Sequence, residues 1–169
     1  MKLVKVSNKI FNECKKHNIH KELLFNEDGR PSVLIMKLKY KGDYHKFVVP
    51  LRSNISPRAP KEQYMSLPPN KNTKPKHSHG IHYIKLFPIK NEYVQSYMIN
   101  DAFDLMIKQI IDNNEKDIVE ACQAYLTECE NGNKHYMSPD IDGILNMFAE
   151  LENKDYTEEK ENDQNDSEE

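Results

Sequence analysis

A guanidinium and a hydroxyl lie side by side where an apolar segment ends, in the sequence Pro50-Leu51-Arg52-Ser53-Asn54. RNA is cleaved through its own 2′-hydroxyl when one group takes the hydroxyl proton, cationic donors hold the phosphate and an acid protonates the leaving 5′ oxygen. The fork of Arg52 matches phosphate geometry, and Ser53 can orient the phosphate or the 2′-hydroxyl by a hydrogen bond. An Arg-Ser pair at a strand end is also an ordinary turn feature, so both interpretations stay open.

Three histidines form a second candidate site, in the sequence Lys74-Pro75-Lys76-His77-Ser78-His79-Gly80-Ile81-His82. Alternating histidines can ligate a metal, but no acid or cysteine lies near them, and the preceding lysines and arginines oppose cation binding. A metal-dependent hydrolase that uses His77, His79 and His82 is therefore the least favoured interpretation, and no metal or other cofactor is expected. His77 and His79 either transfer protons or contact phosphate, or they are ordinary loop residues.

Charge is distributed unevenly along the chain, although the net charge is only −3. Residues 30–90 carry thirteen Lys and Arg against two acids, whereas residues 91–169 carry five Lys against twenty-one acids. A basic segment with so few compensating acids predicts a polyanion partner, and a solvated charged surface is the alternative. The residues expected to bind RNA are Arg58, Lys61, Lys71, Lys74, Lys76, His77 and His79. The rings of Tyr64, Tyr83 and Phe87 can stack on unpaired bases, although the last two are more typical of a core.

An antiparallel hairpin is expected to position Arg52 and Ser53. Residues 32–40 and 45–51 are largely apolar and flank the turn residues Lys41-Gly42-Asp43. Pro50 cannot donate a ladder hydrogen bond, so strand pairing is expected to stop or bulge there. A third strand is expected over residues 81–89. Residues 54–80 hold five prolines and little apolar periodicity, which predicts one long basic loop.

The second half of the chain is expected to be helical. Apolar residues recur at helical spacing over 101–113 and 115–128, with a kink or break at Asn113-Asn114, and a short helix is expected over 140–151. Residues 153–169 hold eight acids and almost nothing apolar, which is typical of a disordered tail. The expected fold class is α+β, with a single compact domain over residues 1–152 and an acidic disordered tail over 153–169.

The cysteines and the amino end indicate a compartment. Cys14, Cys122 and Cys129 contain no CxxC pair, and core packing explains Cys122 and Cys129 better than a metal site. An odd number of scattered cysteines is typical of a reducing compartment. The sequence contains no signal-peptide pattern and no long apolar run, so a cytoplasmic protein with no membrane partner is expected.

Taken together, these segments resemble the ToxN/AbiQ family, the endoribonuclease toxins of type III toxin–antitoxin and phage abortive-infection systems. The resemblance runs in order through residues 1–9, Arg30-Pro31 and the hairpin that ends in Pro50-Leu51-Arg52-Ser53, residues 84–89 and residues 108–118. It implies a twisted antiparallel β-sheet core flanked by helices. It also implies metal-independent cleavage of single-stranded RNA to 2′,3′-cyclic phosphate ends, with a repetitive pseudoknot RNA antitoxin as inhibitor, in a closed assembly of several protein and RNA copies.

Of the functional positions of that family, Ser53 alone carries over directly. Arg52 stands where threonine is common, Ile55 where a lysine follows the serine, and Ser32 or Val33 where another lysine falls. We expect Arg30 and Arg52 to supply the missing cations, so the expected catalytic residues are Ser53, Arg52 and Arg30. The general base and the general acid are not identified. A non-catalytic RNA-binding module, whose basic segment only holds phosphates, is the alternative from a different functional class.

Overall fold

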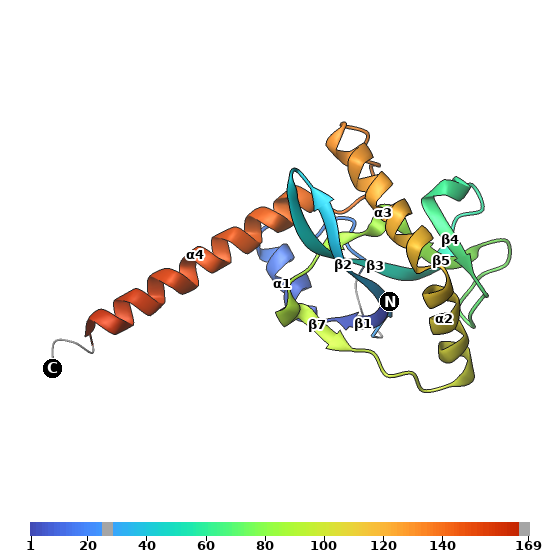
Figure 1. Cartoon of the computed structure of the whole chain (residues 1–169), viewed down its shortest axis with the longest axis horizontal. Coiled ribbons are helices and arrows are strands. Elements are labelled where there is room, and N and C mark those ends of the chain that lie inside the picture. The colour runs from blue at the N-terminus through green and yellow to red at the C-terminus, as the bar shows by residue number, and fades with distance from the viewer. Residues whose placement is uncertain (25–28, 166–169) are drawn as a thin grey trace.

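The computed structural model describes residues 1–24 and 29–165. Within this part of the chain, an antiparallel sheet of seven strands organises the fold (Figure 1). The strands are β1 Lys2–Val6, β2 Ser32–Tyr40, β3 Asp43–Ile55, β4 Tyr64–Leu67, β5 Ser78–His82, β6 Phe87–Pro88 and β7 Val94–Ser96. Their order across the sheet is β4-β5-β3-β2-β1-β7, and β6 pairs with β3. The long strand β3 therefore pairs with three neighbours.

Helices pack against both faces of this sheet. They are α1 Asn8–Lys16, α2 Ala102–Asn113, α3 Glu115–Glu130 and α4 Ile141–Asn165. One apolar core lies between the sheet and the helices α2 and α3, and it includes Ile107, Ile111, Ile118, Cys122 and Leu126. A second core joins the sheet to α1 and the start of α4 through Ile10, Phe11, Cys14, Ile144, Met147 and Phe148. The expected α+β class is confirmed, and the packing expected of Cys122 is confirmed with it.

The central strands are apolar without a break because both of their faces are buried. Val33 and Ile35 belong to the first core, while Leu34, between them, belongs to the second. A strand buried on two faces shows a continuous apolar run rather than alternation. The hairpin of β2 and β3 turns at Lys41 and Gly42, whose φ angles are +51° and +92°. Two positive φ angles are what a tight hairpin turn requires, and glycine adopts one of them without strain.

Pro50 marks the point where β3 changes partner. The ladder with β2 ends at the pair Ser32–Pro50, and the ladder with β5 begins at the pair Leu51–Ile81. The expectation that pairing stops at Pro50 is therefore confirmed for the first ladder, although the strand itself continues to Ile55. This extension carries Ser53 past the edge of the first ladder and into the neighbourhood of β5.

Two expectations about strands are wrong in detail. The segment 81–89 is not one strand, because β5 ends at His82 and a 3₁₀ turn over Tyr83–Lys85 precedes β6. The turn carries Lys85 inward, where its ammonium is bound by Glu22 and by the carbonyl of Met137. The segment 54–80 is not one loop either, because β4 pairs with β5 inside it. By contrast, the expected break between α2 and α3 is confirmed at Asn114.

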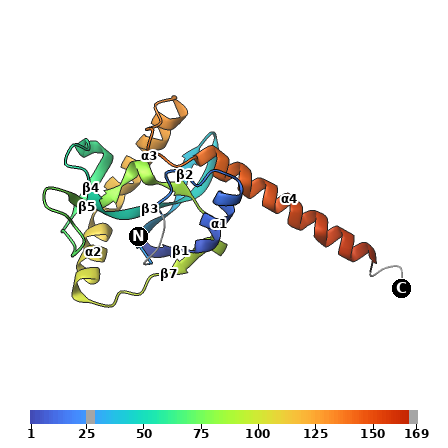
Figure 2. The ribbon, with the colours of Figure 1, turned by 180° about the vertical axis from the view of Figure 1, so that it is seen from behind.

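The last helix is longer than expected. A helix over 140–151 was predicted, and α4 instead continues along the backbone to Asn165, away from the body of the molecule (Figures 1 and 2). Its first part is held by Lys90, whose ammonium contacts the carbonyl of Phe148 at 3.1 Å and the carboxylate of Glu152 at 2.7 Å. The disorder expected for 153–169 stays a prediction, and its last residues, 166–169, lie outside the described part of the chain. The boundary of the folded domain at residue 152 is likewise a prediction.

No helix in the described part of the chain combines the length and the apolar character that crossing a membrane requires.

Candidate active site

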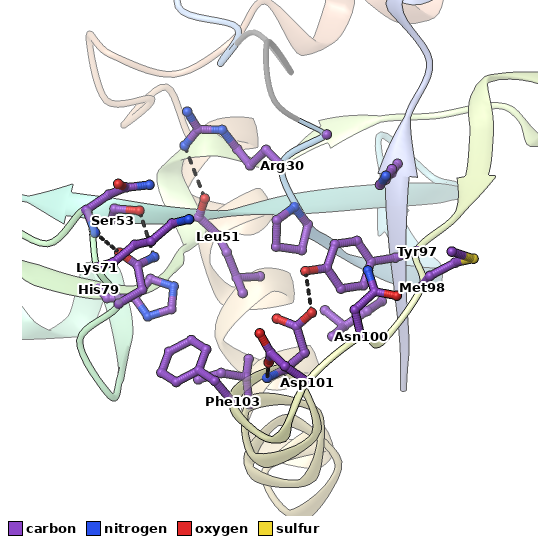
Figure 3. Close-up of a pocket in the computed structure, with 18 of the residues that line it drawn as sticks. Arg30, Leu51, Ser53, Lys71, His79, Tyr97, Met98, Asn100, Asp101 and Phe103 are labelled. Carbon is purple, nitrogen blue, oxygen red and sulfur yellow. Dashed lines mark hydrogen bonds between the residues drawn. The ribbon is translucent and has the colours of Figure 1, made fainter.

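A groove of about 880 Å³ opens where β3 runs past the end of β2, on the face of the sheet that carries α2 (Figure 3). Its walls come from the residues before β2, from the loop between β4 and β5, and from the segment that leads from β7 into α2. Four residues expected to act in catalysis or RNA binding line it, namely Arg30, Ser53, Lys71 and His79. These residues are far apart in the sequence, so the fold brings them together.

A β-bulge sets the position of Ser53. The ladder of β3 and β5 pairs Arg52 with Gly80 and Ile55 with Ser78. Two residues of β3, Ser53 and Asn54, therefore lie opposite His79 alone. Bulges re-aim side chains and are common beside active sites. This bulge places Ser53 and His79 at the same end of the groove.

An asparagine that the sequence did not single out orients the Ser53 hydroxyl. Asn70 donates from Nδ2 to Ser53 Oγ at 2.9 Å, and its Oδ1 accepts from the backbone N–H of Asn72 at 2.9 Å. The second bond fixes which end of the amide faces Ser53, because only a carbonyl oxygen can accept from that N–H. Ser53 Oγ thus accepts one hydrogen bond, and its own hydrogen finds no acceptor within the described residues. The hydroxyl is therefore available to donate to a substrate oxygen.

Asn54 ties the same loop to the end of β3. Its Oδ1 accepts from the backbone N–H of Lys74 at 2.8 Å, and its Nδ2 donates to the carbonyl of Asn72 at 3.1 Å. Together with the bond between Asn70 and Ser53, these contacts hold residues 70–74 against the bulge. Lys71 lies at the exposed tip of this segment and lines the groove.

Positive charge enters the groove from three separate parts of the chain. Arg30 is half-buried and donates from Nη1 to the carbonyl of Leu51 at 3.2 Å, which holds its guanidinium two residues from Ser53 along β3. Lys5 comes from β1, and its ammonium lies 5.9 Å from the centre of the Tyr97 ring. Lys71 comes from the loop. Such a set can neutralise one or two phosphates.

The opposite wall of the groove carries acids and rings. Asp101 caps α2 by accepting from the backbone N–H of Asp104 at 2.8 Å, and Asp104 accepts from the hydroxyl of Tyr97 at 3.0 Å. Burial, together with that bond to Asp104, raises the pKa of Tyr97 to about 12, so this hydroxyl stays protonated. Phe103 stacks on the His79 ring with 6.3 Å between centroids (Figure 3). This wall suits bases and sugar hydroxyls better than phosphates.

Arg52 does not line the groove, although it precedes Ser53 in the sequence. Its Nη1 lies 3.3 Å from Nδ1 of His82, which is buried on the other face of the sheet. Burial lowers the pKa of Arg52, and the negative charge of Glu22 opposes this effect. Burial lowers the pKa of His82 to about 4, with a further contribution from the charges of Arg52 and Lys85. The structure therefore separates Arg52 from Ser53 and Arg30.

The remaining expected RNA-binding residues lie outside the groove, Lys61 in the 3₁₀ helix Lys61–Gln63 and the others on loops. Arg58, Lys61, Lys74 and Lys76 are exposed, and His77 is half-exposed with Nδ1 3.0 Å from the carbonyl of Pro75. Tyr64, one of the rings expected to stack on bases, is buried in β4, as Tyr83 and Phe87 are in the core. Phe103 and Tyr97 are the aromatic rings that reach the groove instead.

The three histidines of the metal hypothesis do not converge. His79 and His82 are three residues apart on β5 and point to opposite faces of the sheet. Both use Nδ1 in contacts with other groups, His79 with the carbonyl of Pro68 and His82 with Arg52. In the residues that the structure describes, no group of three His, Cys, Asp or Glu side chains is placed to hold a metal ion.

Two searches by sequence returned no match, one against family models and one against curated proteins. Comparison with solved structures does find similar folds. One belongs to a bacterial antiviral system that a processed non-coding RNA regulates; it has a TM-score of 0.60 and 18% identity over 86% of this chain and 96% of that chain. Another belongs to a bacterial type III toxin–antitoxin system with selective toxin inhibition by a non-coding RNA pseudoknot; it has a TM-score of 0.64 and 13% identity over 89% and 97% of the two chains.

At these identities the similarity concerns the fold, and it extends over nearly the whole of both known chains. The fold that the resemblance to the ToxN/AbiQ toxins implies is therefore confirmed. The chain has the fold of proteins from RNA-regulated bacterial antiviral and type III toxin–antitoxin systems.

Proposed function

We propose that the protein is a metal-independent endoribonuclease toxin that cleaves single-stranded RNA and leaves 2′,3′-cyclic phosphate ends. The observation that carries this proposal is the Ser53 hydroxyl, which Asn70 orients toward a groove that also holds Arg30, Lys5 and Lys71. Ser53 would donate to a non-bridging oxygen of the scissile phosphate. Arg30 and Lys71 would stabilise the charge that develops on that phosphate, because fixed cationic donors act most strongly in the transition state.

Arg52 receives a different role in this proposal. It sits behind the reacting face and contacts His82, so we propose that it braces the strand that carries Ser53 rather than touching phosphate. The outer loop residues Arg58, Lys61, Lys74, Lys76 and His77 would guide the RNA backbone toward the groove.

The partner that fits this site is an RNA antitoxin. Both similar structures come from systems with a regulatory non-coding RNA, and in one of them that RNA is a pseudoknot that inhibits the toxin. We propose that a repetitive pseudoknot RNA occupies the groove and the basic loops here too, and that several copies of protein and RNA close into one assembly in the cytoplasm. Release of the toxin from this RNA would lead to phage abortive infection.

Cleavage of an unstructured RNA by purified protein in excess EDTA tests the proposed activity. The expected products carry 2′,3′-cyclic phosphate and 5′-hydroxyl ends. Ser53→Ala should abolish cleavage, because the loss of one transition-state donor typically costs about 10²–10³ in rate. Ser96→Ala is the matched control, since Ser96 is exposed on β7 and does not line the groove.

Two results would contradict the proposal in different ways. Cleavage that EDTA stops and that magnesium or zinc restores would indicate a metal-dependent nuclease. Tight RNA binding without any cleavage would favour the non-catalytic RNA-binding module.

A further inference from the structure

His79 is the buried titratable side chain that faces Ser53. It lies on β5 opposite the bulge of Ser53 and Asn54, it lines the groove, and it is only 3% exposed. Figure 3 shows its ring at the groove end that holds Ser53 and Lys71, above the ring of Phe103. A histidine in this place can reach a ribose whose phosphate lies against Ser53.

The contacts of the His79 ring fix its tautomer. Nδ1 lies 2.7 Å from the carbonyl oxygen of Pro68. A carbonyl only accepts hydrogen bonds, so Nδ1 carries the hydrogen and Nε2 of the neutral ring carries the lone pair. The Phe103 ring stacks on the imidazole at an interplanar angle of 25°, which holds the orientation of the ring. Within the described residues, Nε2 has no hydrogen-bond partner of its own.

The protonation state of His79 suits a base. Burial lowers the pKa of His79, and the hydrogen bond to Pro68 partly opposes this shift. The ring is therefore neutral near pH 7, with its lone pair available. The charged groups that line the groove with His79 are Lys5 of β1, Arg30, Lys71 of the loop, Asp101 at the start of α2 and Asp104 of α2.

The carboxylates of the groove are already engaged. Asp101 accepts from the first turn of α2, and Asp104 accepts from Tyr97. Asp101 lies on the wall away from Ser53 in Figure 3. Lysine and arginine side chains are protonated at neutral pH and cannot accept a proton. His79 thus combines a free lone pair, a neutral ring and a place beside Ser53.

We propose that Nε2 of His79 is the general base of the RNA cleavage, an assignment that rests on the proposed function. Nε2 takes the proton of the 2′-hydroxyl while the 2′ oxygen forms a bond to phosphorus. The bond from phosphorus to the 5′ oxygen breaks, and the departing oxygen takes a proton from water. His79 then returns its proton to the solvent. No oxidant, metal ion or second substrate enters this step.

The test compares the pH dependence of single-turnover cleavage in the wild type, in His79→Asn and in His79→Ala. His79→Asn can keep a donor on the carbonyl of Pro68 while it removes Nε2. We expect the wild-type rate to rise with pH and level off at or below neutral pH. Both variants should be slower by about 10²–10⁴, because that is the usual contribution of general base catalysis. Their rates should also no longer rise with pH as the wild-type rate does. Added imidazole should partly restore His79→Ala.

Binding of a cleavage-resistant RNA, with the scissile 2′-hydroxyl replaced by hydrogen, should stay within about threefold of the wild type in His79→Asn, since the base makes its contribution in the transition state. His45→Gln is the matched control, since His45 lies at the far end of β3 and does not line this groove. Equal rates and equal pH profiles in the wild type and His79→Asn would overturn the assignment of His79 as the general base, but would not contradict the proposed nuclease activity. A wild type that binds RNA without cleaving it would overturn the proposed function and the base with it.

Discussion

The chemistry of the groove depends on side chains that are held by short local hydrogen bonds. Asn70 begins a turn in which its backbone N–H donates to Thr73 Oγ1 at 3.0 Å and its Oδ1 accepts from Asn72. Asparagine favours such turns because its side chain imitates a backbone carbonyl. The turn leaves one amide donor for Ser53, so a structural feature of the loop also sets the direction of the hydroxyl.

Replacing Asn70 with alanine should lower both the rate of cleavage and the stability of the fold. Ser53 would lose the donor that orients it, and misplacement of a catalytic group by about 1 Å can cost roughly 10²-fold in rate. The free energy of unfolding should fall by about 1–3 kcal/mol, because the Asn70 side chain makes three partly exposed hydrogen bonds, with Ser53, Asn72 and Thr73. Single-turnover cleavage and urea unfolding measure the two effects. Asn91→Ala, which removes an exposed hydrogen bond from Lys46 outside the groove, should leave the rate of cleavage unchanged. An Asn70→Ala variant of wild-type rate would contradict the orienting role.

The lowered pKa of His82 predicts that the folded protein loses stability in acid. Its pKa is about 4 in the folded protein because the ring is buried beside Arg52 and Lys85, whereas the ordinary value is 6.5. As the pH falls below 6.5, His82 becomes protonated in the unfolded chain, whereas in the folded chain it stays neutral until about pH 4. The free energy of unfolding should therefore fall by about 3 kcal/mol between pH 7 and pH 4 from this residue alone.

Urea unfolding at pH 7, 5.5 and 4 checks this prediction. In His82→Gln, whose amide oxygen can still accept from Arg52, the decrease toward pH 4 should be smaller by the contribution of His82. His79 also has a lowered pKa and remains in both proteins, so the difference between them isolates His82. Identical pH profiles would show that burial does not hold His82 neutral.

The site was only partly predictable from the sequence, and strand alternation explains the limit. Ser53 and Arg52 are adjacent, so the pattern treated them as one site, but neighbours on a strand point to opposite faces. The bulge places Ser53 opposite His79, and the residue types around Ser53 do not predict a bulge. Asn70 had a visible signal in Asn70-Lys71-Asn72-Thr73, which is typical of a side-chain-stabilised turn. Phe103 shares the helical spacing of the apolar residues in 101–113, and no residue type around Tyr97 marks it as part of a site.

At the level of elements, length decided what could be predicted. The long strands β2 and β3 and the helices α2 and α3 have enough apolar residues to show a pattern. β4 has four residues and β7 has three, and such short strands depend on pairing with a neighbour rather than on their own sequence. The apolar residues of segment 81–89 predict one strand, whereas the inward turn at Lys85 depends on partners that are distant in the sequence.

Close approach of two strands predicts a severe effect at Gly80. A Cβ atom at this position would overlap the carbonyl oxygen of Met65 on β4, and a backbone atom cannot move aside without breaking the pairing of β4 and β5. Gly80→Ala should therefore lower the free energy of unfolding by more than about 2 kcal/mol, as overpacking in a tight site does. Gly132→Ala is the control, because it has open space around it and only a positive φ, which costs about 1–2 kcal/mol.

Thermal or urea unfolding of the two variants separates overlap from backbone strain. If Gly80→Ala is no less stable than Gly132→Ala, β4 is not packed against β5 as closely as the structure has it. Cleavage should also fall in Gly80→Ala, because the neighbouring residue His79 would shift with its strand.

The whole molecule is divided by charge in the same way as the sequence. The basic segment supplies β2 to β6, the connecting loops and nine of the nineteen residues that line the groove. The acidic half supplies α2, α3 and the projecting α4 (Figure 2). Some cations of the basic segment form ion pairs within the fold, such as Lys41 with Asp142 and Lys85 with Glu22. Arg58, Lys71, Lys74 and Lys76 are exposed on loops and form no ion pair within the described residues, so they are available to an external polyanion.

An RNA antitoxin should therefore bind with an affinity that falls steeply with salt, because each neutralised phosphate releases counterions. For single strands, the slope of log affinity against log salt is about −0.7 per phosphate engaged. The triple charge reversal Arg58→Glu, Lys74→Glu, Lys76→Glu should weaken binding and flatten this slope. The double reversal Lys116→Glu, Lys134→Glu, on exposed residues of the acidic half, is the control and should change both much less.

Titration of the protein with its candidate repeat RNA at several salt concentrations measures these slopes, and an RNA of scrambled sequence reports specificity. Contacts to unstacked bases depend less on salt than contacts to phosphates do, so the preference for the repeat should persist while the affinity falls. A salt-independent affinity, or equal losses in the triple and double variants, would place the RNA elsewhere on the molecule. If a protein partner neutralised the proposed toxic activity with no RNA present, an RNA antitoxin would be excluded altogether.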